Sequence, residues 1–165
     1  MTEVALRPIE ASDLDAIFEH MRDPESVRMA AFTAKDPDDR AAFDDHWAKI
    51  LASPDTLNRA ITLDGQMVGN IASFVIEGET EVTYWIDRSF WGQGIASRAL
   101  ALLLELNPER PIFGRAASDG AGSLRVLQKA GFVVIGSETS FANARNAEIE
   151  EKILRLDGPP SSVPS

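Results

Sequence analysis

In the first half of the chain, the spacing of hydrophobic residues changes from that of a strand to that of helices. Val4–Ile9 is typical of a strand, and Ser12 is the expected N-cap of a helix that continues to about Met21. Pro24 should end that helix, and a polar stretch follows to Asp36. A second helix is predicted from Pro37 or Asp38 to Leu51. The apolar faces of the two helices would be Leu14, Ile17, Phe18 and Met21 in the first and Phe43, Trp47, Ile50 and Leu51 in the second.

The second half begins with strands. Asn58–Leu63 and Met67–Ile76 flank Asp64-Gly65, a dipeptide that favours a tight hairpin turn, and residues 77–80 turn the chain again into a strand over Glu81–Ile86. A long helix follows, with an inward face of Ile95, Ala99, Leu102, Leu103 and Leu106. The remaining elements are a strand over Pro111–Ala117, a helix over 118–129, and a last pair of strands over Phe132–Phe141 and Glu148–Leu156. We therefore expect a mixed α+β fold.

Length and composition limit the kind of protein this can be. The 165 residues, 44% of them hydrophobic, suit one domain over 1–157, and 158–165 should be a flexible tail. No apolar run is long enough to cross a membrane and the N-terminus does not resemble a signal peptide, so we expect a cytoplasmic protein without a membrane partner. With no cysteine there can be no disulfide, thiolate metal site or cysteine nucleophile. Both histidines lie on predicted helices, and no metal is expected.

Charge is distributed unevenly along the chain. The net charge is −10, yet residues 88–129 carry +3 and all other residues together −13. This balance argues against nucleic acid as a partner. It is compatible with a polyanion bound at 88–129 and a cationic acceptor elsewhere, or with acidic residues that only keep the protein soluble. The aspartates near the second helix allow the same two interpretations: favourable charge at a helix start, or an acidic lip that collects an ammonium group. They are Asp36, Asp38, Asp39, Asp44 and Asp45.

The segment from Trp91 to Leu100 places two glycines between a strand and an apolar helix. Gly92 and Gly94 lack side chains, and the first amides of a helix have no internal partner, so this junction can bind an anion such as a diphosphate. A strand-to-helix turn without any ligand is the plain alternative. A dinucleotide fingerprint is disfavoured because Ser97 stands where a third glycine is required, and the chain has no Gly-Lys-Ser/Thr triplet of a phosphate loop.

A second block, Ser118–Phe132, has a capping candidate in Ser118 or Asp119, apolar Leu124 and Leu127, and Gly131 as a stop. With this block the chain, over about residues 4–157, resembles the GNAT superfamily of acetyl-CoA-dependent N-acetyltransferases. Gly92, Gln93, Gly94, Ile95 and Ala96 match the family's glycine loop, although Trp91 replaces its usual first Gln or Arg.

Trp91 and the second block are similar to the branch that acetylates the N-termini of ribosomal proteins. Matching positions in that block are Asp119, Ser123, Arg125, Val126, Leu127, Lys129, Gly131 and Phe132, whereas Gly120 replaces an Asn. The resemblance implies a twisted, mostly antiparallel sheet of six to seven strands, flanked by about four helices, in which a splayed strand pair holds acetyl-CoA.

The implied reaction is direct attack of a primary amine, from a protein N-terminus or a small cationic molecule, on the thioester of bound acetyl-CoA. The residues expected to contact the cosubstrate are Trp85, Ile86, Trp91, Gly92, Gln93, Gly94, Ile95, Ala96, Ser97, Asp119 and Ser123. Glu81 is the candidate general base. Because Leu127 occupies the family's usual tyrosine position, Ser123 is the candidate partner of the leaving thiol, and the single tyrosine, Tyr84, is expected in the core. The competing hypothesis is an acyl-CoA-binding module without turnover. A homodimer is compatible with the family.

Overall fold

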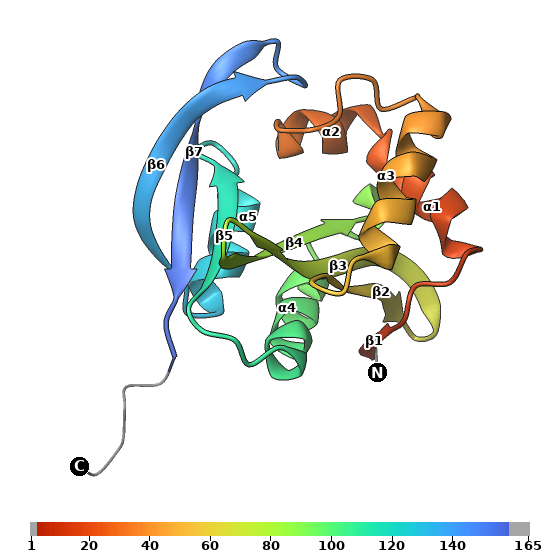
Figure 1. Ribbon diagram of the computed structural model, residues 1–165, viewed down its shortest axis with the longest axis horizontal. Helices are drawn as coiled ribbons and strands as arrows, with labels where there is room; N and C mark the ends of the chain where they lie inside the picture. Colours follow the sequence, from red (N-terminus) through yellow and green to blue (C-terminus); the bar gives the residue numbers. More distant parts are fainter. Residues whose placement is uncertain (1–2, 159–165) are drawn as a thin grey trace.

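The computed structural model describes residues 3–158, which form one seven-stranded sheet with helices on both faces (Figure 1). The strands are β1 (Val4–Arg7), β2 (Leu57–Leu63), β3 (Gln66–Ile76), β4 (Glu79–Ile86), β5 (Ile112–Ala117), β6 (Val133–Ala142) and β7 (Ala147–Leu156). The helices are α1 (Asp13–Met21), α2 (Pro24–Ala30), α3 (Arg40–Ala52), the 3₁₀ turn η1 (Arg88–Phe90), α4 (Ile95–Leu106) and α5 (Ala121–Lys129). The strand order is β1-β2-β3-β4-β5-β7-β6.

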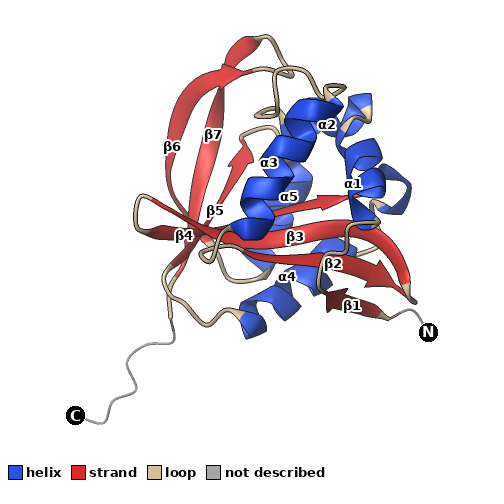
Figure 2. Cartoon of the chain, turned by 45° about the vertical axis from the view of Figure 1, so that its right-hand side comes forward, coloured by secondary structure: helices blue, strands red, loops and turns tan. Residues whose placement is uncertain are grey.

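Successive side chains of β4 point to opposite faces of the sheet, and their contacts show which helices cover each face (Figure 2). Val82, Tyr84 and Ile86 point to the face covered by α4 and α5, where they join the main apolar core. On the opposite face, the Trp85 indole N–H donates a hydrogen bond of 3.0 Å to the His20 carbonyl at the end of α1. The sheet therefore separates a side formed by α4 and α5 from a side formed by α1, α2 and α3.

Strands β4 and β5 separate soon after they meet. Their parallel pairing is limited to Thr80 with Ile112 and Glu81 with Phe113, whereas every other neighbouring pair in the sheet is antiparallel. Beyond Glu81 the two strands share no register, although β5 stays paired with β7 over its full length. The result is a slot through the sheet between the second halves of β4 and β5, as the resemblance implied.

The tip of the β6–β7 hairpin bends over the sheet and contacts the end of α2 (Figure 1). The Ala144 N–H donates to the Ala31 carbonyl at 3.2 Å, and the Asn143 side-chain amide donates to the Thr33 carbonyl at 2.8 Å. The Arg145 guanidinium donates to the Arg28 carbonyl at 2.7 Å. These bonds tie together segments more than a hundred residues apart in the sequence.

Several expectations for individual elements are confirmed. The hairpin at Asp64-Gly65 forms with φ of 51° and 87°, the left-handed values that a tight two-residue turn requires. Gly131 follows α5 with φ of 104°, as expected for a helix stop. The mixed α+β class and the mostly antiparallel sheet are also confirmed, with seven strands in residues 3–158. The proposed tail, 158–165, lies outside the described residues apart from Gly158.

Other expectations are wrong. The polar stretch that begins at Pro24, where no helix was expected, contains α2. Its start is capped by the Asp23 carboxylate, which accepts from the Ser26 N–H at 3.0 Å. Ser12 holds the expected N-cap position of α1 but makes no side-chain capping bond. At α5 the N-cap is Gly120, rather than Ser118 or Asp119. Two residues placed on inward helix faces are exposed, Leu51 by 45% and Leu106 by 50%, and each lies in the last turn of its helix.

Candidate active site

The glycine loop forms an open turn at the start of α4. Gly92 and Gly94 both adopt left-handed φ, 80° and 74°, a conformation that side chains with a Cβ disfavour. No atom lies within 4 Å of the position that a Cβ would take at either glycine, so the approach to the backbone is free. The Arg98 N–H makes the first helical bond to the Gly94 carbonyl, which leaves the amides of Ile95, Ala96 and Ser97 without a helical partner. This arrangement can bind an anion.

Two side chains hold this loop in place. The Trp91 indole N–H donates to the Ile86 carbonyl at 3.0 Å, which fixes the loop to the end of β4. The Arg98 guanidinium donates to the Gln93 and Gly94 carbonyls at 3.0 and 3.4 Å. The positive charge of Arg98 therefore lies beside the loop, and the carbonyls of Gln93 and Gly94 point toward it. Trp91 thus has a structural role at the position where the family usually has Gln or Arg.

The first turn of α5 forms the facing wall. Asp119 pairs with Arg145 across 2.7 Å, and this hydrogen bond holds the pKa of the Asp119 carboxyl below its usual value. A Cβ at position 120 would lie 3.0 Å from the Ala117 carbonyl oxygen, so a larger residue there would require a small shift of the backbone.

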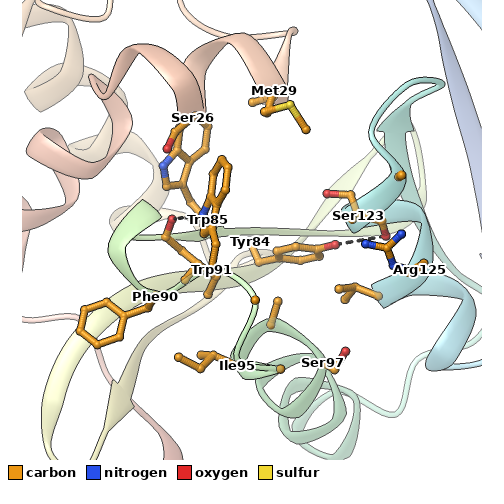
Figure 3. Close-up of a pocket in the computed structure, with 18 of the residues that line it drawn as sticks. Ser26, Met29, Tyr84, Trp85, Phe90, Trp91, Ile95, Ser97, Ser123 and Arg125 are labelled. Atoms are coloured by element: carbon orange, nitrogen blue, oxygen red, sulfur yellow. Dashed lines mark hydrogen bonds between the residues drawn. The ribbon is translucent and has the colours of Figure 1, made fainter.

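A cavity of about 770 Å³ connects the loop to the other face of the sheet through the slot. Figure 3 shows Tyr84 pointing from β4 toward Ser123 on α5, and Ser26 and Met29 line the cavity from α2. Of the residues expected at the cosubstrate, the cavity is lined by Trp85, Ile86, Trp91, Gly92, Gly94, Ile95, Ala96, Ser97, Asp119 and Ser123. Gln93 does not line it, and its carbonyl accepts a hydrogen bond from Arg98. Arg125 and Lys129 add positive charge to the wall.

The edge of β4 presents backbone donors to the slot. The Asp87 N–H donates to the Val68 carbonyl on β3 at 2.8 Å. Antiparallel strands alternate between bonded and non-bonded pairs, so the N–H groups of Ile86 and Tyr84 point away from β3. The hydrogen bond of the Ile86 carbonyl is consistent with this orientation, since the carbonyl accepts from Trp91 instead of from β3. Of the two expected donors, Ile86 rather than Trp85 therefore faces the slot.

Glu81 lies on the opposite face from Tyr84 and is only 9% exposed. Its carboxylate accepts a hydrogen bond of 3.0 Å from Arg115, which also bonds to Glu138 and Glu151. Burial alone would lower the pKa of Arg115, but these carboxylates raise it, and burial raises the pKa of Glu151. Glu81 does not line the cavity described above. Three carboxylates around one guanidinium leave this face negatively charged.

Ser26, Met29 and Ala30 line the cavity from α2, within the stretch 21–35 that the sequence led us to expect beside the acceptor, although no helix was expected there. One contribution was not expected from the sequence. Tyr84, expected in the core, also lines it, and its hydroxyl donates to the Ser123 carbonyl at 3.5 Å. Burial raises the pKa of Tyr84, against the opposing effect of this hydrogen bond. A large aromatic residue on a strand is usually part of the core, so the sequence contained no clear signal that the Tyr84 hydroxyl would line the slot.

Comparison with known proteins agrees with this architecture. The family model described as "Acetyltransferase (GNAT) domain" matches residues 3–133. RimJ of Mycobacterium smegmatis, solved in complex with CoA-disulfide, has 22% identity and a TM-score of 0.80, over 98% of this chain and 84% of that chain. RimL, a ribosomal L7/L12 α-N-protein acetyltransferase solved with coenzyme A, has 18% identity and a TM-score of 0.77, over 94% of each chain.

YncA from Salmonella typhimurium, solved with its cofactor acetyl-CoA, has 16% identity and a TM-score of 0.71, over 98% of each chain. At these identities the three structures show a shared fold. A search among curated proteins gives no match. Because the family model covers most of the chain, the protein belongs to the GNAT family of acetyltransferases.

Proposed function

We propose that this protein transfers the acetyl group of acetyl-CoA to a primary amine by direct attack within a ternary complex. The observation that carries the proposal is the continuous cavity from the start of α4, through the β4–β5 slot, to Trp85 and α2 on the other face. Such a passage would let a thioester enter from the α4 side and meet an acceptor from the α2 side. Because this slot opens beside a helix start that can bind an anion, a thioester whose carrier contains a diphosphate is favoured.

The chain's own residues fit acetyl-CoA along this path. The amides over Gly92–Ser97 would bind the diphosphate, with Arg98, Arg125 and Lys129 supplying positive charge. The Ile86 N–H would donate to the thioester carbonyl oxygen, where negative charge develops during attack. Ser123 would contact the pantetheine arm from α5, and Asp119 would contact it from the segment just before that helix. Trp91 would act indirectly, by holding the loop through its bond to Ile86.

The acceptor side favours a cationic amine that loses a proton before attack. Glu81 is our candidate general base, because it is a buried carboxylate on β4 that faces the α2 side of the sheet. The proton of the amine would reach Glu81 through water, since the Glu81 side chain does not line the cavity. Glu138 and Glu151 add to the negative charge of this face. The acceptor is a protein N-terminus or a small cationic molecule, and the fold shared with RimJ and RimL supports the first.

The experiment is a measurement of thiol release from acetyl-CoA with a panel of amines. The panel contains peptides with free N-termini, the same peptides already acetylated at the N-terminus, and small polyamines. We expect turnover with at least one free amine and none with the blocked peptides. Cosubstrate binding without turnover on every amine would favour the competing hypothesis of an acyl-CoA-binding module and would refute the proposed reaction.

The role of Glu81 is tested with Glu81→Gln, which keeps the size of the side chain and removes its basicity. We expect kcat to fall about a hundredfold or more, with acetyl-CoA affinity unchanged, because loss of a general base slows the chemical step. Glu79→Gln is the matched control, since Glu79 is an exposed carboxylate on the same strand. A kcat for Glu81→Gln equal to that of Glu79→Gln would remove Glu81 from the mechanism.

Partners are predicted from charge and sequence. In residues 3–158 no helix is long and apolar enough to span a membrane. The net charge of −10 continues to argue against nucleic acid as a partner. A homodimer is also proposed, and light scattering of the purified protein would test it.

A further inference from the structure

We propose that the hydroxyl of Tyr84 donates a hydrogen bond to the sulfur of coenzyme A as it leaves the acetyl group. This inference rests on the proposed function and assigns to the reaction a residue that the sequence places in the core. It begins from the position of Tyr84 in the slot. Its ring stands on the α5 side of β4, and its hydroxyl lies 3.5 Å from the Ser123 carbonyl (Figure 3).

The hydroxyl lies where the thioester would be held. The N–H groups of Ile86 and Tyr84 both point into the slot, and the carbonyl oxygen of the thioester is proposed to accept from Ile86. The sulfur is bonded to the same carbonyl carbon, so it must lie close to that stretch of β4. Its carrier would arrive from the side of α4 and α5, the same side to which the Tyr84 ring points.

Four hydroxyl side chains line the cavity, and three of them are less suited to this role. Ser97 lies in the first turn of α4, beside the proposed diphosphate site, and the Ser26 hydroxyl donates to Asp23 at 2.9 Å. Ser123 is closest to Tyr84, but an aliphatic hydroxyl is a weaker donor than a phenol, whose ordinary pKa is about 10.

Tyr84 is also free to change partner. Its bond to the Ser123 carbonyl is long at 3.5 Å, near the limit for a hydrogen bond, so little is lost if it turns to a ligand. Burial raises the pKa of Tyr84, which keeps the phenol protonated and able to donate throughout the neutral range. A buried donor with one weak partner is a group for which a better acceptor would be favourable.

The step balances without ionising the phenol. The neutral amine nitrogen attacks the carbonyl carbon and forms the C–N bond, and its surplus proton passes to the proposed base. The C–S bond then breaks, and its electron pair leaves on sulfur as a thiolate that accepts the hydrogen bond from Tyr84. The thiolate later takes a proton from water. Tyr84 stabilises the leaving group and keeps its own proton throughout.

The test measures the pKa of the thiol of bound coenzyme A. A hydrogen bond from Tyr84 stabilises the thiolate, so Tyr84→Phe should raise this pKa by about one unit, a tenfold change in proton affinity. The readout is the ultraviolet absorbance of the thiolate during a pH titration of the complex, with the complex of dethio-coenzyme A subtracted. We also expect kcat to fall about ten- to a hundredfold, with little change in coenzyme A affinity.

Because the chain contains a single tyrosine, a second variant is available that keeps the ring and the hydroxyl. Growth with 3-fluorotyrosine changes residue 84 alone and makes its phenol a stronger donor. The pKa of the bound thiol should then fall below that of the unmodified protein. Ser97→Ala is the contrast, because it removes a hydroxyl from the same cavity at the diphosphate end and should weaken binding without moving the thiol pKa.

The outcomes separate this inference from the proposed function. If the unmodified protein fails to bind coenzyme A, the proposed function fails and the inference with it. If coenzyme A binds and the thiol pKa is the same with tyrosine, fluorotyrosine and phenylalanine at 84, the inference alone is overturned. A shift caused by Ser123→Ala instead of Tyr84→Phe would also overturn it, since Ser123 would then be the donor.

Discussion

Replacing Gly94 with Glu tests the anion site by placing a negative charge against the bound diphosphate. Gly94 has φ of 74° and no atom within 4 Å of a Cβ position, so the new side chain meets no steric barrier in the free protein. The left-handed φ costs a residue with a Cβ about 1 kcal/mol. That cost is paid in both the free and the bound state, so it lowers stability and leaves affinity unchanged.

The loss of affinity comes from charge. A carboxylate about 5 Å from one phosphate charge is repelled by about 3 kcal/mol at the effective dielectric of a protein surface. Since each 1.4 kcal/mol changes an equilibrium about tenfold, acetyl-CoA should bind more than a hundredfold more weakly. Calorimetric titration measures this directly, and thermal unfolding measures the cost in stability.

Gly78→Glu is the matched control for this variant. Gly78 has a similar φ of 80°, also has no atom within 4 Å of a Cβ position, and lies in the turn before β4, at the opposite end of that strand from the glycine loop. Both variants should lose about 1 kcal/mol of unfolding free energy, and only Gly94→Glu should lose binding. Equal affinities for acetyl-CoA in the two variants would refute our assignment of the diphosphate to this loop.

Two further predictions concern the framework around the site. Asp13 is 6% exposed and accepts hydrogen bonds from Arg7 at 2.7 and 2.8 Å, which lower the pKa of its carboxyl. Asp13→Asn should therefore cost about 2 kcal/mol of unfolding free energy at neutral pH. This contribution is present above about pH 4 and is lost as the pH falls through the lowered pKa, so denaturant titrations should show the two proteins converging in acid, and parallel curves would contradict the reasoning. Trp91→Phe removes the indole N–H bond to Ile86, and it should lower stability by about 1 kcal/mol and weaken acetyl-CoA binding several-fold. Thermal unfolding and calorimetry check this, and unchanged values in both would show that Trp91 does not position the loop.

Local patterns predicted the elements whose signals lie within a few residues. Asp64-Gly65 predicted its hairpin because the φ values of that turn suit these two residues. The glycines at 92 and 94 predicted an open helix start for the same reason. The helix after Asp23 was not predicted because Pro24 can end a helix, although Pro is equally suited to a first helical position.

The remaining features depend on contacts between distant residues. The ion pair of Glu81 with Arg115 spans 34 positions and exists because β4 and β5 meet at their starts. The separation of those strands leaves no mark in composition, and the family resemblance alone implied it. The hydroxyl of Tyr84 reaches the slot because β5 turns away from β4, so its neighbours in the sequence could not reveal it.

The central claim is that the backbone amides over Gly92–Ser97 bind the diphosphate of acetyl-CoA. A crystal structure of the protein soaked in acetyl-CoA tests it most directly. We predict diphosphate oxygens within hydrogen-bond distance of these amides and the acetyl group in the slot between β4 and β5. Acetyl-CoA bound elsewhere, with this loop empty, would contradict the account.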